Sequence, residues 1–141
     1  MRTLVLFLLC LPQAVAAWTF APEPICTVAD TQDAVTIEVT FDPATALYAI
    51  AFTRAAGWPD TTTLALHFDR GMGDLTITTD RHVVEGPRLS VTDRGFGNVL
   101  RGLEFFGRAT LLMDGLTLGF DTTQAGEPVR AFRDCPATPT A

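Results

Sequence analysis

The chain has 141 residues and a formal net charge of −6, and all ten of its basic residues are arginine. The arginines are scattered and form no basic run, which excludes the electrostatic footprint of a nucleic-acid-binding protein or of a protein that docks on an anionic membrane. Without lysine, the chain also cannot contain a GxxxxGK[ST] phosphate-binding loop.

The first sixteen residues follow the order of a cleavable signal peptide. Arg2 provides the positive charge, an apolar run follows at residues 4–11, and Ala14-x-Ala16 provides the small residues that a signal peptidase requires. An N-terminal core helix is the alternative interpretation. The apolar run is about eight residues long, well short of the ~20 that a membrane-spanning helix needs. We therefore expect a signal peptide at residues 1–16, periplasmic or secreted localisation, and no stable membrane insertion after cleavage.

Alternation of apolar and polar residues predicts a series of antiparallel strands in the rest of the chain. The strand at residues 47–53 is apolar on both faces, which places it centrally in a sheet. Turn residues at 70–73 and 114–115 predict two hairpins. The predicted strands cover residues 34–41, 47–53, 63–69, 75–79, 89–93, 109–113 and 116–122. One face of the first hairpin is expected to be apolar, with Leu64, Leu66, Phe68, Leu75 and Ile77.

Helical spacing occurs only near the C-terminus. Apolar residues recur at this spacing after Asn98, a suitable N-cap, and Gly102 within the stretch indicates a short helix. A second short helix is predicted at residues 128–133. Many short strands with few helices predict a mainly β domain at residues 17–135, an antiparallel β-sandwich or small barrel with one or two short helices near the C-terminus. Residues 136–141 are expected to form a flexible tail.

Cleavage of the leader removes Cys10 and leaves Cys26 and Cys135 near opposite ends of the mature chain. In an oxidising compartment, two such cysteines most simply form a disulfide with each other. Two free thiols or an intermolecular bridge are the alternatives. An internal disulfide would attach the C-terminal helix to a strand that begins near Cys26.

The reactive side chains of the mature chain are few. Ser90 is its only serine, and it alternates with apolar neighbours as a solvent-facing strand residue does. His67 and His82 would lie roughly 20 Å apart on a regular hairpin, too far to share a metal ion. A glycine-rich turn at residues 95–97 could hold an anion at a helix N-terminus, but it lacks the third glycine of a dinucleotide-binding loop. We therefore expect no enzymatic activity, no metal site and no cofactor.

One set of polar and aromatic residues falls at predicted strand ends and turns, where recognition residues commonly lie. As a surface patch it would serve a non-catalytic domain that binds or supports another envelope component, and this is the function that we expect. Turn-stabilising ion pairs and a packed tryptophan are the structural alternative. Two other functions stay open: a small hydrolase or lyase that uses Asp80, Asp93 and His82, and a small carrier with an apolar cavity between its sheets. The patch consists of Arg54, Trp58, Asp80, Arg81, His82, Asp93 and Arg94.

Several motifs resemble a family of short, exported alphaproteobacterial proteins. The longest is TDRGFGNVLRGLEF at residues 92–105, and others are Trp18-x-Phe20 and Trp58-Pro59. Members of this family are often named as the B component of excinuclease ABC, but this chain lacks a phosphate-binding loop, is acidic and carries an export signal, so we exclude a DNA-repair ATPase. The resemblance implies export and a disulfide but no activity. The order of helix, hairpin and helix near the C-terminus is also similar to that of invasion-associated locus B-type secreted proteins.

Overall fold

The computed structural model describes residues 17–135, so the predicted signal peptide and C-terminal tail lie outside the described residues. The helices found there have nine residues each and do not reach the length that a bilayer crossing requires. One sheet contains β1 (Thr19–Ala21), β2 (Cys26–Gln32), β3 (Val35–Asp42), β4 (Leu47–Thr53), β7 (Val83–Glu85) and β8 (Arg88–Asp93). The other contains β5 (Leu64–Gly71), β6 (Gly73–Thr79), β9 (Arg108–Met113) and β10 (Leu116–Asp121). The helices are α1 (Gly97–Phe105) and α2 (Gly126–Asp134).

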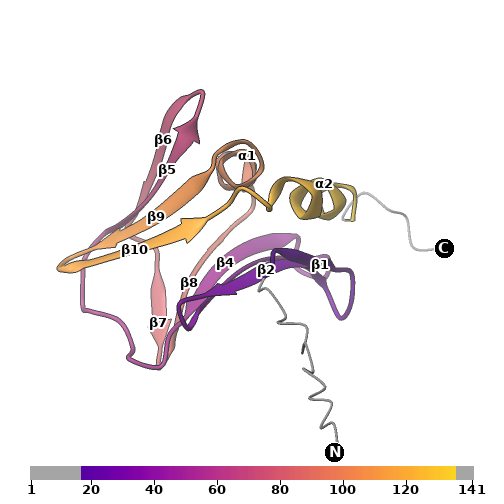
Figure 1. The fold of residues 1–141 in the computed structure, drawn as a ribbon. Helices are drawn as coiled ribbons and strands as arrows, with labels where there is room; N and C mark the ends of the chain where they lie inside the picture. The colour runs from indigo at the N-terminus through magenta and orange to yellow at the C-terminus, as the bar shows by residue number, and fades with distance from the viewer. Residues whose placement is uncertain (1–16, 136–141) are drawn as a thin grey trace, which may run out of the picture.

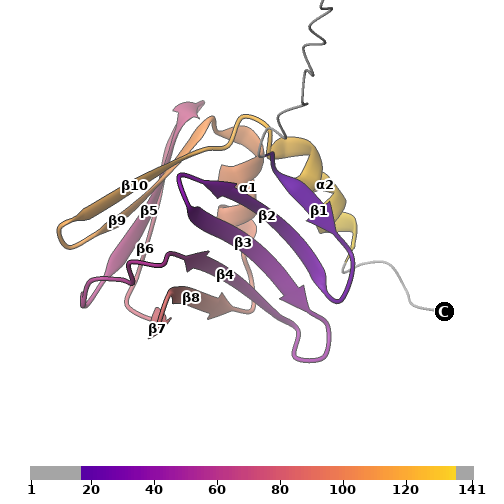
Figure 2. The same cartoon turned by 60° about the horizontal axis from the view of Figure 1, so that its bottom comes forward.

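Two antiparallel sheets pack face to face, with both helices at one end of the molecule (Figure 1). The six-stranded sheet has the order β1-β2-β3-β4-β8-β7, and the four-stranded sheet has the order β10-β9-β5-β6. The predicted mainly β class is therefore confirmed, and of the two predicted architectures the structure adopts the sandwich. Figure 2 shows the six-stranded sheet from its outer side, with β1 beside α2 and β7 at the opposite edge.

The six-stranded sheet follows the alternation of its sequence. β4 lies between β3 and β8, as its two apolar faces predict, and pairs Ile50 with Val39 on one side and with Val91 on the other. These side chains face the opposite sheet. Ser90 pairs with Ala51 on the outer face of the sheet, where Ser90 is half-buried and Ala51 is buried.

The four-stranded sheet is built from two hairpins. β5 and β6 pair Leu66 with Ile77 and Phe68 with Leu75, and the register then shifts before Gly71. The predicted apolar face is therefore confirmed, because each pair places two apolar side chains on the same side of the sheet. β9 pairs with the other edge of β5 and leaves β6 as the edge strand.

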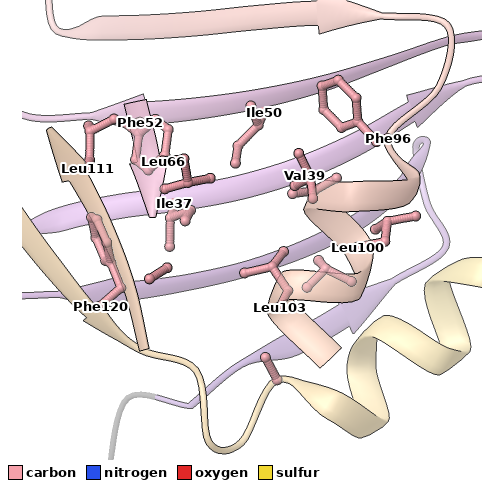
Figure 3. Packing of buried hydrophobic residues seen from close by; sticks show 14 of the residues in the cluster. Ile37, Val39, Ile50, Phe52, Leu66, Phe96, Leu100, Leu103, Leu111 and Phe120 are labelled. Carbon is pink, nitrogen blue, oxygen red and sulfur yellow. The ribbon is translucent and has the colours of Figure 1, made fainter. Parts of the chain in front are cut away.

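The core fills the space between the sheets and is closed at one end by α1. Figure 3 shows side chains from both sheets and from α1 pointing toward one another. The largest side chains that are almost completely buried include Phe68, Phe120, Phe132, Ile37, Leu89, Leu103 and Leu111. Burying a side chain of this size stabilises a fold by about 1.5–3 kcal/mol relative to leaving it exposed, so this layer is the main source of stability.

α1 lies directly against β5 because Gly102 has no side chain. A Cβ atom at Gly102 would lie 2.4 Å from Cδ2 of Phe68, whose ring is fully buried. The predicted N-cap is wrong: the helix is capped by Phe96, and Asn98 lies inside the first turn without a side-chain capping bond. Phe96 is 6% exposed and its ring stacks on that of Tyr48 at 5.7 Å, so burial of this ring positions the start of the helix.

One lateral side of the sandwich is held together by a covalent bond and by hydrogen bonds. The predicted disulfide is present and joins Cys26 in β2 to Cys135, which follows α2. On the same side, the indole N–H of Trp18 donates a hydrogen bond to the carbonyl oxygen of Asp121 at 2.8 Å. The side chain of Gln32 donates to this carbonyl and accepts from the backbone N–H of Asp121, each at 2.8 Å. These contacts join β1 and β2 to the end of β10.

A bidentate ion pair links β5 to β9. The Arg108 guanidinium donates hydrogen bonds to both carboxylate oxygens of Asp69, at 3.0 and 2.7 Å, and the two residues are direct cross-strand partners. The hydrogen bond from Arg108 lowers the pKa of Asp69 below its ordinary value of 3.8. The charged form of Asp69 is therefore favoured by folding.

We expect the free energy of unfolding of the Asp69→Asn variant to depend less on pH in the acid range than that of the native protein. A carboxylate whose pKa is depressed in the folded state contributes stability above its unfolded pKa and loses that contribution as pH falls through the folded pKa. Below the ordinary value of 3.8, the free energy of unfolding of the native chain should therefore fall more steeply with decreasing pH than that of the variant. Urea denaturation across an acidic pH series measures both slopes. The exposed turn residue Asp114, changed to Asn, is the control and should retain the native slope; equal slopes in all three proteins would contradict the prediction.

Candidate functional site

A cleft of about 760 Å³ lies between the two sheets, on the side opposite the disulfide. β4 and β8 form one wall, β5 and β6 form the other, and the first turn of α1 borders one end. Its lining residues include Ile50, Phe52, Leu64, Leu66, Ile77, Thr79, Asp80, Arg81, Val91, Asp93, Phe96, Asn98 and Val99.

The floor of the cleft is apolar because strand alternation turns one face of each sheet inward. Ile50 and Phe52 of β4 are 4% and 2% exposed, and Leu64 and Leu66 of β5 are 5% and 4% exposed. All four side chains belong to the continuous core, so the floor is rigid and already formed. Figure 3 shows three of them, Ile50, Phe52 and Leu66, lying close together between the sheets.

Nearer to solvent, the cleft walls carry apolar side chains that are only half-buried. Ile77 in β6 and Val91 in β8 face the interior and line the cleft. Both lie on strands with an open edge, because β6 is the last strand of its sheet and β7 covers β8 only from Arg88 to Ser90. Apolar surface of this kind is the part of the cleft that a bound apolar group would bury.

The mouth of the cleft carries charge. Asp80 and Arg81 follow β6, and Asp93 ends β8, so three ionisable residues at the ends of strands from different sheets meet at one opening. Within residues 17–135, the side chains of Asp80 and Arg81 form no hydrogen bond or ion pair, while Asp93 accepts one hydrogen bond from the backbone N–H of Arg94 at 2.7 Å. With two carboxylates and one guanidinium among the lining residues, the mouth is net negative.

The predicted surface patch is divided by the structure. Arg54 and Trp58 lie at the far end of β4, where the guanidinium stacks over the indole ring at 5.1 Å from its centre. Trp58 donates its indole N–H to the carbonyl oxygen of Pro87 at 2.8 Å, and the Arg54 side chain donates to the carbonyl oxygen of Gly57. These contacts stabilise two neighbouring turns, as the structural alternative for the patch predicted. Neither residue lines the cleft.

His82 is turned away from the cleft. Its Nε2 donates a hydrogen bond to the carbonyl oxygen of Thr61 at 2.9 Å, since a carbonyl can only accept, and its buried Nδ1 has no partner within residues 17–135. His82 is absent from the cleft lining, whereas Asp80 and Asp93 are part of it. The three side chains that a hydrolase or lyase would use therefore do not face one cavity.

The sequence identified the charged residues of the cleft but not the cleft itself. Asp80, Arg81 and Asp93 were predicted as part of a surface patch, and the structure brings them together at the mouth. Ile77 and Val91 were missed as functional residues. The alternation of apolar and polar residues assigns both to the core face, and it cannot show that they lie at a part of the sheet that is left uncovered. The feature that could have identified them is that both are inward-facing residues of strands with an open edge.

Comparisons with protein families, with curated proteins and with solved structures find no match to the chain. Within residues 17–135, no group of three or more His, Cys, Asp or Glu side chains is placed to hold a metal ion.

Proposed function

We propose that this protein is an exported, non-catalytic binding domain that holds an apolar part of another envelope component in the cleft between its sheets. The observation that carries the proposal is the accessible apolar surface of Ile77 and Val91 above a buried apolar floor. A preformed concave site with an apolar lining and a few polar groups at its rim is the usual form of a binding pocket.

Export is supported by two independent features. The leader pattern at residues 1–16 has the charge, apolar run and small residues of a signal peptide. The Cys26–Cys135 disulfide is of the kind that persists in an oxidising compartment such as the periplasm or the extracellular space.

Binding is favoured over catalysis by the placement of the ionisable residues. An acid–base site needs its groups within hydrogen-bond reach of one substrate atom, often with a third group that orients them. Here His82 is bonded to the carbonyl oxygen of Thr61, and no histidine is among the residues that line the cleft.

Filling the cleft tests the proposal. We expect the uncharged dye N-phenyl-1-naphthylamine to bind the native protein with a rise in fluorescence, and the Val91→Trp variant to bind it at least about tenfold more weakly, a loss of about 1.4 kcal/mol. Leu112, which is 39% exposed on the outer face of β9, provides the matched control Leu112→Trp. Circular dichroism checks that both variants are folded.

The control should bind the dye as tightly as the native protein. Absence of dye binding to the native protein, or equal affinity of the native protein and both variants, would show that the cleft is not a site for apolar groups.

A further inference from the structure

The open edge of β6 runs along the cleft. β6 pairs with β5 on one side, and no strand within residues 17–135 pairs with its other side. Every second residue of an edge strand directs its N–H and C=O groups away from the sheet, where another strand can bind them. In natural proteins, lysine, proline or an inward-pointing charge usually protects an edge strand from pairing with another chain. Residues 75–79 of β6 contain none of these: they are uncharged, and Ile77 is followed by two threonines.

The two faces of β6 differ in a way that a paired strand would continue. Leu75, Ile77 and Thr79 are half-buried on the cleft side, whereas Thr76 and Thr78 are exposed on the outer side. Residues directly opposite each other in adjacent strands share a face. An added strand would therefore place the residues opposite Ile77 and Thr79 over the cleft, where apolar side chains would cover its exposed walls.

The acidic residues at the two ends of the uncharged stretch of β6 favour a partner with basic residues. Asp74 and Asp80 are exposed and bracket the uncharged stretch, and neither side chain forms a hydrogen bond or ion pair within residues 17–135. A basic residue opposite each of them would gain an opposite-charge cross-strand pair. The net negative mouth of the cleft favours the same charge.

A second copy of this chain is a poorer partner for the edge. Antiparallel pairing about a two-fold axis at Ile77 would place Asp74 opposite Asp80 of the other copy at both ends. Like charges directly opposite each other destabilise a strand pair, and each chain already carries a formal charge of −6.

We propose that the cleft binds an extended polypeptide segment that pairs with β6 as an additional strand, with apolar residues facing the cleft and a basic residue opposite each of Asp74 and Asp80. This inference rests on the proposed function and names its partner class. Backbone hydrogen bonds to the edge would supply affinity, and the alternate side chains would supply specificity, as in other cases of strand addition.

A short palindromic peptide tests the inference, because it reads the same in either strand direction. The probe is Arg-Val-Thr-Val-Thr-Val-Arg with blocked ends and a fluorescent label, and its binding is measured by fluorescence polarisation. We expect it to bind the native protein and to bind the Asp74→Lys/Asp80→Lys variant at least about tenfold more weakly. The matched control Glu23→Lys/Glu127→Lys has the same change in net charge at exposed positions beside β1 and in α2, on the side opposite the cleft, and it should bind within about twofold of the native protein.

Two further peptides test charge and register. Glu-Val-Thr-Val-Thr-Val-Glu should reverse the order of affinities and bind the Asp74→Lys/Asp80→Lys variant best. Arg-Thr-Val-Thr-Val-Thr-Arg, which turns its valines to the outer face, should bind the native protein more weakly than the first peptide. Hydrogen exchange should show new protection of alternate backbone N–H groups within residues 75–79 when the first peptide is bound.

Several outcomes would overturn the inference. Among them are equal affinity of the first peptide for the two charge variants, protection that omits β6, and a stable dimer of the native protein in which β6 is already protected. If the dye binds the cleft but the first peptide does not bind, the strand-addition inference fails while the proposed function stands. If neither binds, both fail.

Discussion

Replacement of Gly102 by alanine is expected to destabilise the domain by about 2 kcal/mol, although alanine is the better helix former. Helix propensity alone predicts a gain of up to about 1 kcal/mol. The new Cβ atom would, however, lie 2.4 Å from the fully buried ring of Phe68, and overpacking of a core costs about 1–3 kcal/mol. The clash decides the sign because the ring is enclosed by the core and cannot move aside without displacing its neighbours.

Chemical denaturation of Gly102→Ala measures the effect, and Gly97→Ala is the control in the same helix. A Cβ atom at Gly97 would meet no atom within 4 Å, so this variant should be as stable as the native protein or slightly more stable. Combining Gly102→Ala with Phe68→Leu tests the cause, since the smaller side chain relieves the clash and the two costs should not add. An unchanged or increased stability of Gly102→Ala would contradict the close approach of α1 to β5.

Loss of the Cys26–Cys135 disulfide is expected to cost about 2–5 kcal/mol. The bond closes a loop with a sequence separation of 109, for which the chain-entropy model gives about 4–5 kcal/mol. The expected consequence is a large fall in the midpoint of guanidinium denaturation for the Cys26→Ser/Cys135→Ser variant. A loss of this size removes much of the 5–15 kcal/mol that typically stabilises a domain.

Reduction of the native protein should reproduce the effect of the double substitution. A phosphine reductant should lower the denaturation midpoint of the native protein and leave that of Cys26→Ser/Cys135→Ser unchanged. Mass spectrometry after thiol alkylation without reduction should find no modified cysteine in the native mature protein. Two alkylated cysteines under these conditions would contradict the pairing seen in the structure.

The strands were predictable wherever one face of a strand is uniformly apolar. β3 and β4 were predicted almost to the residue because their inward rows consist of aliphatic and aromatic side chains. β2 lacks a uniformly apolar inward face, because Asp30 is one of its inward residues. This residue is 7% exposed, and hydrogen bonds from the backbone N–H of Thr31 and the side chain of Gln32 satisfy it. β7 has only three residues, all exposed, and is too short to show an alternation of apolar and polar residues.

The helix α1 shows a different limit of prediction. Its sequence contains an amphipathic spacing, which was sufficient to place a helix there. Gly102 was interpreted as a weakness of that helix because propensity describes only local conformation. The contact with Phe68 joins residues from distant segments, and only the structure shows that the glycine is required for packing.

The position of the cleft could not be predicted because it depends on how two consecutive hairpins, β5–β6 and β7–β8, are divided between the two sheets. Asp80 follows β6 of the four-stranded sheet and Asp93 ends β8 of the six-stranded sheet, and their meeting at one mouth follows from the order of strands in both sheets. Arg54 and Trp58 resemble them in sequence context, at the ends and turns of strands, yet they stabilise turns at another position. Local pattern identifies which residues are polar and near a strand end, but not which of them share an opening.

The covalently tied side of the sandwich has a consequence for how the domain can be attached to other structures. Ala17 lies beside α2, where it borders a shallow hollow together with Glu127, and Cys135 directly follows that helix. Both ends of the described chain therefore lie on the flank opposite the mouth of the cleft. A tether, tag or fused domain attached at residue 17 or residue 135 would be joined on that flank, so we expect immobilisation through either position to leave the mouth of the cleft accessible.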